Sequence, residues 1–489
     1  MRRRHSRLLL ILFRCSLVIS LCGPVAFGQT GVAQLNEPPS TGSTPSSGAP
    51  NRVGAQSPFL GSVPSGKATG AAIPLSIRDA LERGLKYNLG LIESDLSARS
   101  SRAERLRALS HLLPNINASL SQTVEQIDLK AMGINFPGVP TTFGPFGVQD
   151  ARGFLSQKVF DWNAVEELRA STERLKASQY TYKNSRDIVV LAVGNAYLLV
   201  VSDAASVESQ QAQLNTSQAL YQRAIDRREA GLAARINEMR AKVEMQTQQQ
   251  RLIASQNQLA KDKLSLGRII GLPPGQEFTL ADKVPYAPLE GVTLEKALED
   301  AYANRSDYSS AEAEVRAAEL ARRGAAAERY PSISTNLNYG DIGPNFANSH
   351  GTFTFAATLN VPIFQGGRVK ADELQADTVL RQKQAELGDL RGRIDDEVRS
   401  AFLDLNSAHD LVNVSKNNLE LANETLAQAK DRFAAGVTDN LEVVQAQESV
   451  AAANQAYISS LYSFNIAKVE LAKAAGIAER AVKNYLGGK

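Results

Sequence analysis

Two proline-free stretches of equal length most constrain how this chain can fold. No proline occurs from residue 146 to 272 or from residue 363 to 489. Within both stretches glycine is sparse, and apolar residues recur at the three- and four-residue steps of an amphipathic helix. A helix of about 65 residues is roughly 100 Å long. The pattern therefore predicts helices much longer than those of a compact domain.

Each proline-free stretch contains one break. EAGLAARIN (residues 229–237) interrupts the first stretch, and AAGVTDN (residues 434–440) interrupts the second. We expect Gly231 and Gly436 to adopt the left-handed conformation that ends the first, descending helix of each stretch. Asp439 and, three residues later, Glu442 fit a capping box for the ascending helix. Each stretch is thus predicted to form an antiparallel helical hairpin.

The sequence is duplicated. TLEKALEDAYANR, from Thr293, resembles SIRDALERGLKYN, from Ser76, and further along the duplication aligns Gly436 with Gly231. Each copy is predicted to contain a helix, two strands and a long helical hairpin. We divide the chain into a signal peptide (1–28), a leader (29–72), a first repeat (73–271), a linker (272–292), a second repeat (293–477) and a tail (478–489).

The N-terminus has the three parts of a secretory signal peptide. Arginines at positions 2, 3, 4 and 7 precede an apolar run from Leu8 to Leu21, and Ala26-Phe27-Gly28 is a small-x-small cleavage site. An N-terminal membrane anchor is the alternative, but the apolar run is shorter than the roughly 20 residues that a span needs. Export past the inner membrane of a bacterium is therefore expected.

The segments around the cleavage site add three expectations. Loss of residues 1–28 removes five arginines and no carboxylate, which changes the net charge from +3 to −2, so the basic charge does not indicate a nucleic-acid partner. Both cysteines, Cys15 and Cys22, lie in this segment, and the sequence around Cys22 loosely resembles a lipidation site. Residues 29–72 are rich in Gly, Pro, Ser and Thr, which predicts a flexible leader.

The predicted strands alternate between two different faces. In GTFTFAATLNVPIF (residues 351–364), apolar residues from Phe353 to Ile363 alternate with Thr, Ala and Asn, and NINASLSQTVEQ (residues 115–126) alternates similarly. Such strands suit a membrane barrel with lipid outside and water inside, or a soluble sheet over a core. The best candidate for a membrane helix, residues 188–201, is too short and contains Gly194 and Asn195.

Export without a plausible membrane helix favours the barrel. Four strands per chain cannot close a barrel, because the smallest membrane barrels have eight. An open sheet edge is not tolerated in lipid. The predicted fold class is therefore mainly α-helical with a β-barrel sector, and the chain is expected to oligomerise.

This duplicated plan resembles the TolC-like outer-membrane efflux protein family. The resemblance covers residues 75–271 and 293–477, and it is most specific in NVPIFQGGRVKAD (residues 360–372) and RFAAGVTDNLEVVQAQ (residues 432–447). The strand-to-helix junctions fall at Pro362, Gly366 and Gly367 in the second copy and at Asp161 and Trp162 in the first.

The resemblance implies a homotrimer. Four strands per protomer would form a twelve-stranded barrel in outer-membrane lipid, continued by an α-helical tunnel across the periplasm. The inner end of the tunnel would meet a periplasmic adaptor and an inner-membrane pump, as in tripartite efflux or type I secretion. Substrate would pass through unchanged, and no cofactor is implied.

The resemblance also assigns roles to the hairpin tips. The residues expected to dock the adaptor are Gly231, Leu232, Ala233, Gly436, Val437, Thr438 and Asp439. The positions expected to form the periplasmic gate are Glu442, Gln445 and Asn237. Gln445 and Asn237 depart from the family pattern, because both side chains are neutral. Glu442 is either a gate residue or a helix cap.

No catalytic or metal-binding pattern stands out in the sequence. The four histidines, His5, His111, His350 and His409, are scattered, and no cysteine lies beyond residue 22. We therefore predict a non-enzymatic conduit. The alternative is an exported coiled-coil structural or adhesive protein, which would need neither the amphipathic strands nor the strand-to-helix junction. Drugs, metal ions and proteins all stay open as cargo.

Overall fold

The computed structural model describes residues 57–133, 138, 140–282, 289, 292–438 and 440–485. The predicted signal peptide, Cys22 and Asp439 lie outside the described residues. The first copy comprises α1 (Ile77–Tyr87), α2 (Leu89–Ser110), β2 (Asn115–Asp128), β3 (Thr142–Phe160), α3 (Trp162–Glu229) and α4 (Arg235–Ile269). The second comprises α5 (Leu294–Asn304), α6 (Ser306–Ala327), β5 (Ser332–Gly343), β6 (His350–Asn360), α7 (Arg368–Ala434) and α8 (Asn440–Ala474).

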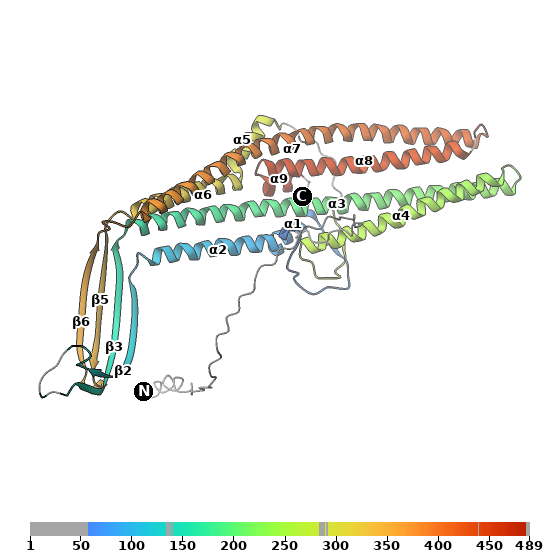
Figure 1. Ribbon diagram of the computed structural model, residues 1–489. Helices are drawn as coiled ribbons and strands as arrows, with labels where there is room; N and C mark the ends of the chain where they lie inside the picture. The colour runs from blue at the N-terminus through green and yellow to red at the C-terminus, as the bar shows by residue number, and fades with distance from the viewer. Residues whose placement is uncertain are drawn as a thin grey trace, which may run out of the picture. The chain divides into compact units, whose positions relative to one another are not determined.

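The proline-free stretches form the predicted helical hairpins. α3 has 68 residues and α4 has 35, while α7 and α8 have 67 and 35. At 1.5 Å per residue, α3 is about 100 Å long. α3 packs against α4, α2, α6 and α8, and α7 packs against α8 and α6 (Figure 1). The second helix of each hairpin, α4 or α8, is about half as long as the first, α3 or α7. The two helices of a hairpin therefore lie side by side only in the half that leads to its tip.

The four long strands form one antiparallel sheet in the order β2-β3-β5-β6. The central pair, β3 and β5, joins the two copies, with Leu155 opposite Leu337. Large apolar side chains on one face are open to the surroundings, and Ile116, Leu120 and Phe353 are 74, 69 and 74% exposed. The outer edges of β2 and β6 have no strand partner among the described residues. The alternation predicted from the sequence is confirmed.

The last strand is shorter than the pattern predicted. We expected a strand over residues 351–364, but β6 ends at Asn360, and residues 361–365 have no regular structure. Proline has no N–H to donate to a ladder, so pairing stops before Pro362. Ile363 and Phe364 are 94 and 88% exposed, although the alternation placed Ile363 on the apolar face of the strand.

The single helix expected before each pair of strands is two helices in both copies. In the first copy the break lies at Asn88, whose side-chain Nδ2 donates to the carbonyl of Phe59 at 2.7 Å. In the second copy the break lies at Arg305, which pairs with Asp307 at 2.6 Å and with Glu397 at 2.7 Å. Both side chains are buried and satisfied at the break. The backbone is extended at both residues, with ψ of 132° at Asn88 and 119° at Arg305, so the helix does not continue through them.

The largest core surrounds the middle of α3. Val189, Val193 and Tyr197 are fully buried together with Leu75 and Leu266. α3 is also long and apolar enough, by length and composition alone, to meet the test for a membrane span. The sequence expectation that no segment resembles a membrane helix is therefore too strict on hydropathy alone. Burial of these residues in the core accounts for their apolar character.

Several small elements were not predicted from the sequence. β1 (Ile73–Leu75) pairs in parallel with β4 (Phe278–Leu280), and α9 (Ala478–Tyr485) follows the second copy. Residues 57–65, which we placed in a flexible leader, pack against the first copy. The N–H of Val63 donates to Tyr87 O at 2.9 Å, and the ring of Phe59 lies over Gly90, where a Cβ atom would approach it to 2.5 Å.

Candidate functional site

Both hairpin tips end their descending helix in the same way. Gly231 has φ of 74°, the N–H of Leu232 donates to Arg227 O at 2.8 Å, and the N–H of Gly231 donates to Arg228 O at 2.9 Å. This pair of hydrogen bonds defines a Schellman motif. In the second copy Gly436, with φ of 76°, ends α7 with the equivalent bonds at 3.1 and 3.0 Å. The predicted left-handed glycine stops are therefore confirmed.

The predicted docking residues are prominent at these tips. Leu232 and Val437, which follow the two glycines, are both 70% exposed. Ala233 and Thr438 come next in the chain and are half-buried. Exposed apolar side chains that recur at equivalent positions mark candidate contact surfaces.

The two copies differ in how they use their arginines. The duplication aligns Arg227 with Arg432 and Asn237 with Glu442. In the second copy Arg432 donates to Glu442 Oε1 at 2.9 Å, and the Thr438 hydroxyl donates to the other carboxylate oxygen. Both carboxylate oxygens of Glu442 are therefore bonded within its own tip, and these bonds join the end of α7 to the start of α8.

In the first copy the neutral Asn237 offers no charge to Arg227. Arg227 instead reaches the other hairpin, where its guanidinium lies 4.6 Å from the centroid of the Phe433 ring and donates to Phe433 O at 3.3 Å. A separate pair, between Arg228 and Glu238, closes the first tip at 2.5 Å. The duplication thus produces two closed tips and one link between them.

The linked tips enclose a small cavity of about 280 Å³. Both hairpins contribute to its lining, which is Ala224, Arg227, Leu232, Ala233, Asn237, Phe433, Val437 and Thr438. The structure therefore brings Asn237 and four predicted docking residues together. Gln445 lies on α8 and does not line this cavity. Arg227 and Phe433 were not identified from the sequence, although the duplicated arginine was a visible signal.

The strand-to-helix junctions use different chemistry in the two copies. Asp161 caps α3, because its side chain accepts from the N–H of Ala164 at 3.2 Å, and it also pairs with Lys158 at 2.7 Å. Trp162, the first residue of α3, has its ring centroid 6.2 Å from that of Phe160, and both side chains are partly exposed. Aromatic side chains of this kind are typical of a membrane interface.

The second junction depends on two glycines. Gly366 and Gly367 have φ of 57° and 87°, and Gly367 is the residue before α7. Consecutive left-handed residues would strain any other side chain. Together with Pro362, they turn the chain from β6 into α7 within a few residues.

A polar network crosses the other face of the sheet. Arg152 on β3 pairs with Asp150 at 3.2 Å, donates to Asn338 at 2.6 Å and reaches Thr352 on β6 at 3.0 Å. To reach β6 it passes over Gly340 on β5, where a Cβ atom would lie 2.8 Å from the Arg152 Cβ. The face opposite the apolar side chains is therefore held by polar bonds, as expected for the water-filled side of a barrel.

A sequence profile described as outer membrane efflux protein matches residues 81–272 and 297–477, one segment in each half of the chain. The chain belongs to the outer membrane efflux protein family. It is an outer-membrane channel of the efflux-pump type and a transport protein, not an enzyme. Membership decides against the alternative of a coiled-coil adhesive protein.

Individual relatives support this assignment. The chain is 23% identical over 417 residues to the toluene efflux pump outer membrane protein TtgC of Pseudomonas putida, a match that covers 82% of this chain and 83% of TtgC. It is 25% identical over 407 residues to the pyoverdine export outer membrane protein OpmQ of Pseudomonas aeruginosa, a match that covers 81% and 84%. The CmeC outer membrane channel of Campylobacter jejuni has the same fold, with a TM-score of 0.72 at 16% identity over 91% of this chain and 98% of that one.

Proposed function

We propose that three copies of this chain form one outer-membrane conduit, which receives substrate from a periplasmic adaptor and an inner-membrane pump. The open edges of β2 and β6 in the described part of the chain carry this proposal. Strand edges exposed to lipid leave backbone N–H and C=O groups without partners, at several kcal/mol each. Pairing β6 of one protomer with β2 of the next satisfies them, and three copies supply twelve strands, within the range of closed membrane barrels.

The helices favour the same assembly. Apolar side chains are exposed along α7, including Leu374, Leu403 and Leu421 at 63, 67 and 61%. On α4, Val243 and Ile253 are 63 and 60% exposed. Exposed apolar surface that continues along a helix indicates contact with another chain. Neighbouring protomers would cover these side chains while the barrel closes.

The hairpin tips are the proposed docking site for the adaptor. Gly231, Leu232 and Ala233 of one tip and Gly436, Val437, Thr438 and Asp439 of the other would present six turns per trimer. The exposed Leu232 and Val437 provide apolar anchors. The tips are the part of the chain farthest along α3 and α7 from the sheet, so they would face the inner membrane.

We propose that contacts between the two hairpin tips of one protomer hold the gate closed. Unpaired carboxylates at the gate positions would contribute less. Glu442 is the one acid at the predicted gate positions, and Arg432 balances its charge. Gln445 and Asn237 carry no charge. Separation of the two hairpins would require Arg227 to release Phe433. Glu442 would then contribute by keeping the second tip intact.

Cargo selection would reside in the pump. The relatives are named for toluene efflux and for pyoverdine export, two chemically unlike substrates. A channel of shared fold that serves both is expected to be permissive. Export of the precursor by residues 1–28 and lipidation at Cys22 both stay predictions.

Crosslinking from the tips tests the proposal. A photoreactive amino acid at Val437, with a matched one at Leu264 of α4 as control, compares two positions that are 70 and 72% exposed. We expect the tip position to crosslink to a periplasmic adaptor, identified by mass spectrometry, and the control position not to. Gly436→Pro should abolish that crosslink and leave the trimer intact. Equal adaptor capture at both positions would contradict the docking site, and a monomeric chain in detergent would contradict the trimer.

A further inference from the structure

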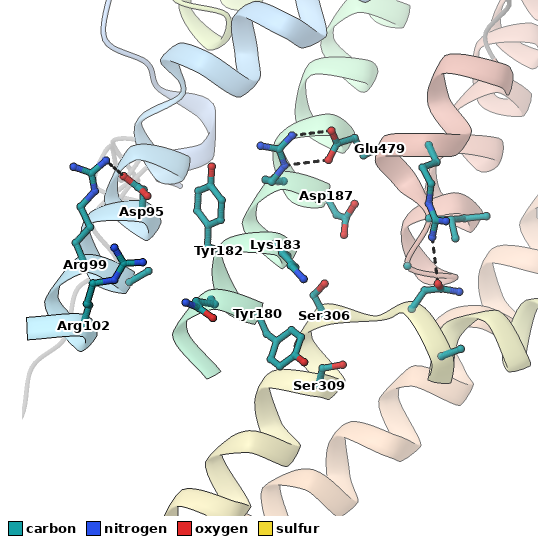
Figure 2. Close-up of a pocket in the computed structure, with 18 residues that line it drawn as sticks. Asp95, Arg99, Arg102, Tyr180, Tyr182, Lys183, Asp187, Ser306, Ser309 and Glu479 are labelled. Atoms are coloured by element: carbon teal, nitrogen blue, oxygen red, sulfur yellow. Dashed lines mark hydrogen bonds and ion pairs between the residues drawn. The ribbon is translucent and has the colours of Figure 1, made fainter. Parts of the chain in front are cut away.

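A large cavity lies on the described part of the chain, far from the tips. It has a volume of about 1550 Å³ and is bounded by α2, by α3, by the junction of α5 and α6 and by the start of α9 (Figure 2). Its residues on α3 run from Gln179 to Asp187, in the half of that helix nearer the sheet. At 1.5 Å per residue they lie about 25–40 Å from the strand-to-helix junction at Trp162. The cavity therefore belongs to the periplasmic part of the channel.

The cavity carries an excess of positive charge. Five cationic side chains line it, Arg99, Arg102, Lys183, Arg186 and Arg480, and three carboxylates oppose them, Asp95, Asp187 and Glu479. Arg99 pairs with Asp95 at 2.8 Å, and Arg186 pairs with Glu479 through two bonds of 2.7 and 3.0 Å.

After these pairings, three cations are available to a ligand. Arg102 and Lys183 have no carboxylate within ion-pair distance in the part of the chain that the structure describes. The Lys183 ammonium lies 5.3 Å from the centroid of the Tyr180 ring, so a ligand would contact Lys183 beside that ring. Arg480 donates to the neutral side chain of Asn304 at 3.2 Å. Figure 2 shows Arg102 on α2 and Lys183 on α3, with the Lys183 ammonium turned towards Ser306 on α6. Burial, followed by the charges of Glu479 and Asp307, raises the pKa of Asp187 to about 6, which limits its competition for these cations in mildly acidic conditions.

The remaining lining is suited to a hydroxylated ligand. Tyr180 and Tyr182 contribute aromatic rings, and Ser306, Ser309 and Gln179 contribute hydroxyl and amide groups. The aliphatic lining is limited to Ala98, Ala303 and Ile477. A lipid tail would find little apolar surface there, whereas the C–H face of a sugar ring packs on a tyrosine and its hydroxyls bond to short polar side chains.

We propose that this cavity binds an anionic saccharide, with its acidic groups between Arg102 and Lys183 and its rings against Tyr180 and Tyr182. The volume exceeds the upper limit of about 1000 Å³ for typical small-molecule sites, which favours an oligosaccharide over a single ion. Charge-assisted bonds from arginine and lysine are the strong contacts available for a carboxylate or a phosphate.

Titration of the purified full-length protein in detergent with three probes tests this inference. The probes are trigalacturonate, which carries three carboxylates on three sugar rings, the neutral maltotriose, and inorganic phosphate. We expect calorimetric binding of trigalacturonate only, with affinity that falls as salt is added because the contacts are ionic. Absence of trigalacturonate binding, or equal binding of maltotriose, would overturn the proposal. Full competition by phosphate at the same concentration would overturn the saccharide assignment.

A matched pair of variants locates the site. Arg102→Gln combined with Lys183→Gln removes the two cations, and trigalacturonate affinity should fall at least about tenfold. Arg251→Gln removes a charge from an exposed position of α4 outside the cavity and should leave the affinity unchanged. A thermal melt of each variant shows that the fold is retained. Unchanged affinity in the double variant, or an equal loss in Arg251→Gln, would refute the assignment of this cavity.

Discussion

Arg227→Ala should loosen the inner end of the channel. Arg227 is half-buried and makes two contacts with Phe433, the ring contact at 4.6 Å and the hydrogen bond at 3.3 Å. A cation–π contact at a partly exposed site contributes about 0.5–1 kcal/mol. A long hydrogen bond from a charged donor adds about 1 kcal/mol. The sum is about 1.5–2 kcal/mol per protomer, which corresponds to roughly a 10- to 30-fold change in the ratio of joined to separated tips.

Single-channel recording in planar lipid bilayers measures this ratio. We expect the time spent in the high-conductance state to rise at least about tenfold in Arg227→Ala. Arg223→Ala is the matched control, because Arg223 is exposed one turn earlier on α3. Asn237→Glu should reproduce the effect, since a carboxylate at this position recreates the pair that holds Arg432 in the second copy. Unchanged recordings for Arg227→Ala, or the same change in Arg223→Ala, would refute the link between the tips.

Three further substitutions probe other parts of the fold. Burial and the neighbouring Asp262 raise the pKa of Asp203 to about 7. The stability that Asp203 contributes is therefore present below about pH 4 and is lost as the pH rises towards 7. Asp203→Asn should raise the melting temperature at about pH 8 but not at about pH 4, and an equal rise at both would contradict this. Gly340→Ala places a Cβ atom 2.6 Å from the Cα of Arg152 on β3 and should destabilise the sheet by roughly 1–3 kcal/mol. We expect loss of the trimer on electrophoresis, and a normal trimer yield would disprove the prediction. Phe59→Ala should cost about 1–2 kcal/mol and speed hydrogen exchange at the start of α2, and unchanged exchange would show that residues 57–65 do not hold α2.

Much of the architecture could be predicted because local rules decide it. The absence of proline allows helices of great length, and Gly231 and Gly436 stop them through their backbone freedom alone. The period-two alternation of β2 and β6 shows which side chains share a face. Pro362 was a visible stop signal, yet the alternation continued past it to Ile363, and the strand was predicted too long.

The side-chain contacts at the site could not be predicted from local rules. Whether Arg227 binds its own tip or the other one depends on the residue aligned with Glu442, and that residue is Asn237. Asp203 and Asp262 lie almost equally far from the first tip along the chain, but only the pairing of α3 with α4 makes them neighbours. The duplication contained part of this information, because comparison of the aligned copies shows which charges lack a partner.

Thiol labelling along β2 tests the central claim most directly, since the only native cysteines lie in the predicted signal peptide. Leu120 is 69% exposed on the apolar face, and Ser119 lies opposite Arg152 on the polar face. In isolated outer membranes, a water-soluble maleimide should label Ser119→Cys, and only a lipid-soluble maleimide should label Leu120→Cys. Labelling of both positions by the water-soluble reagent would contradict a sheet with lipid on one side and the channel lumen on the other.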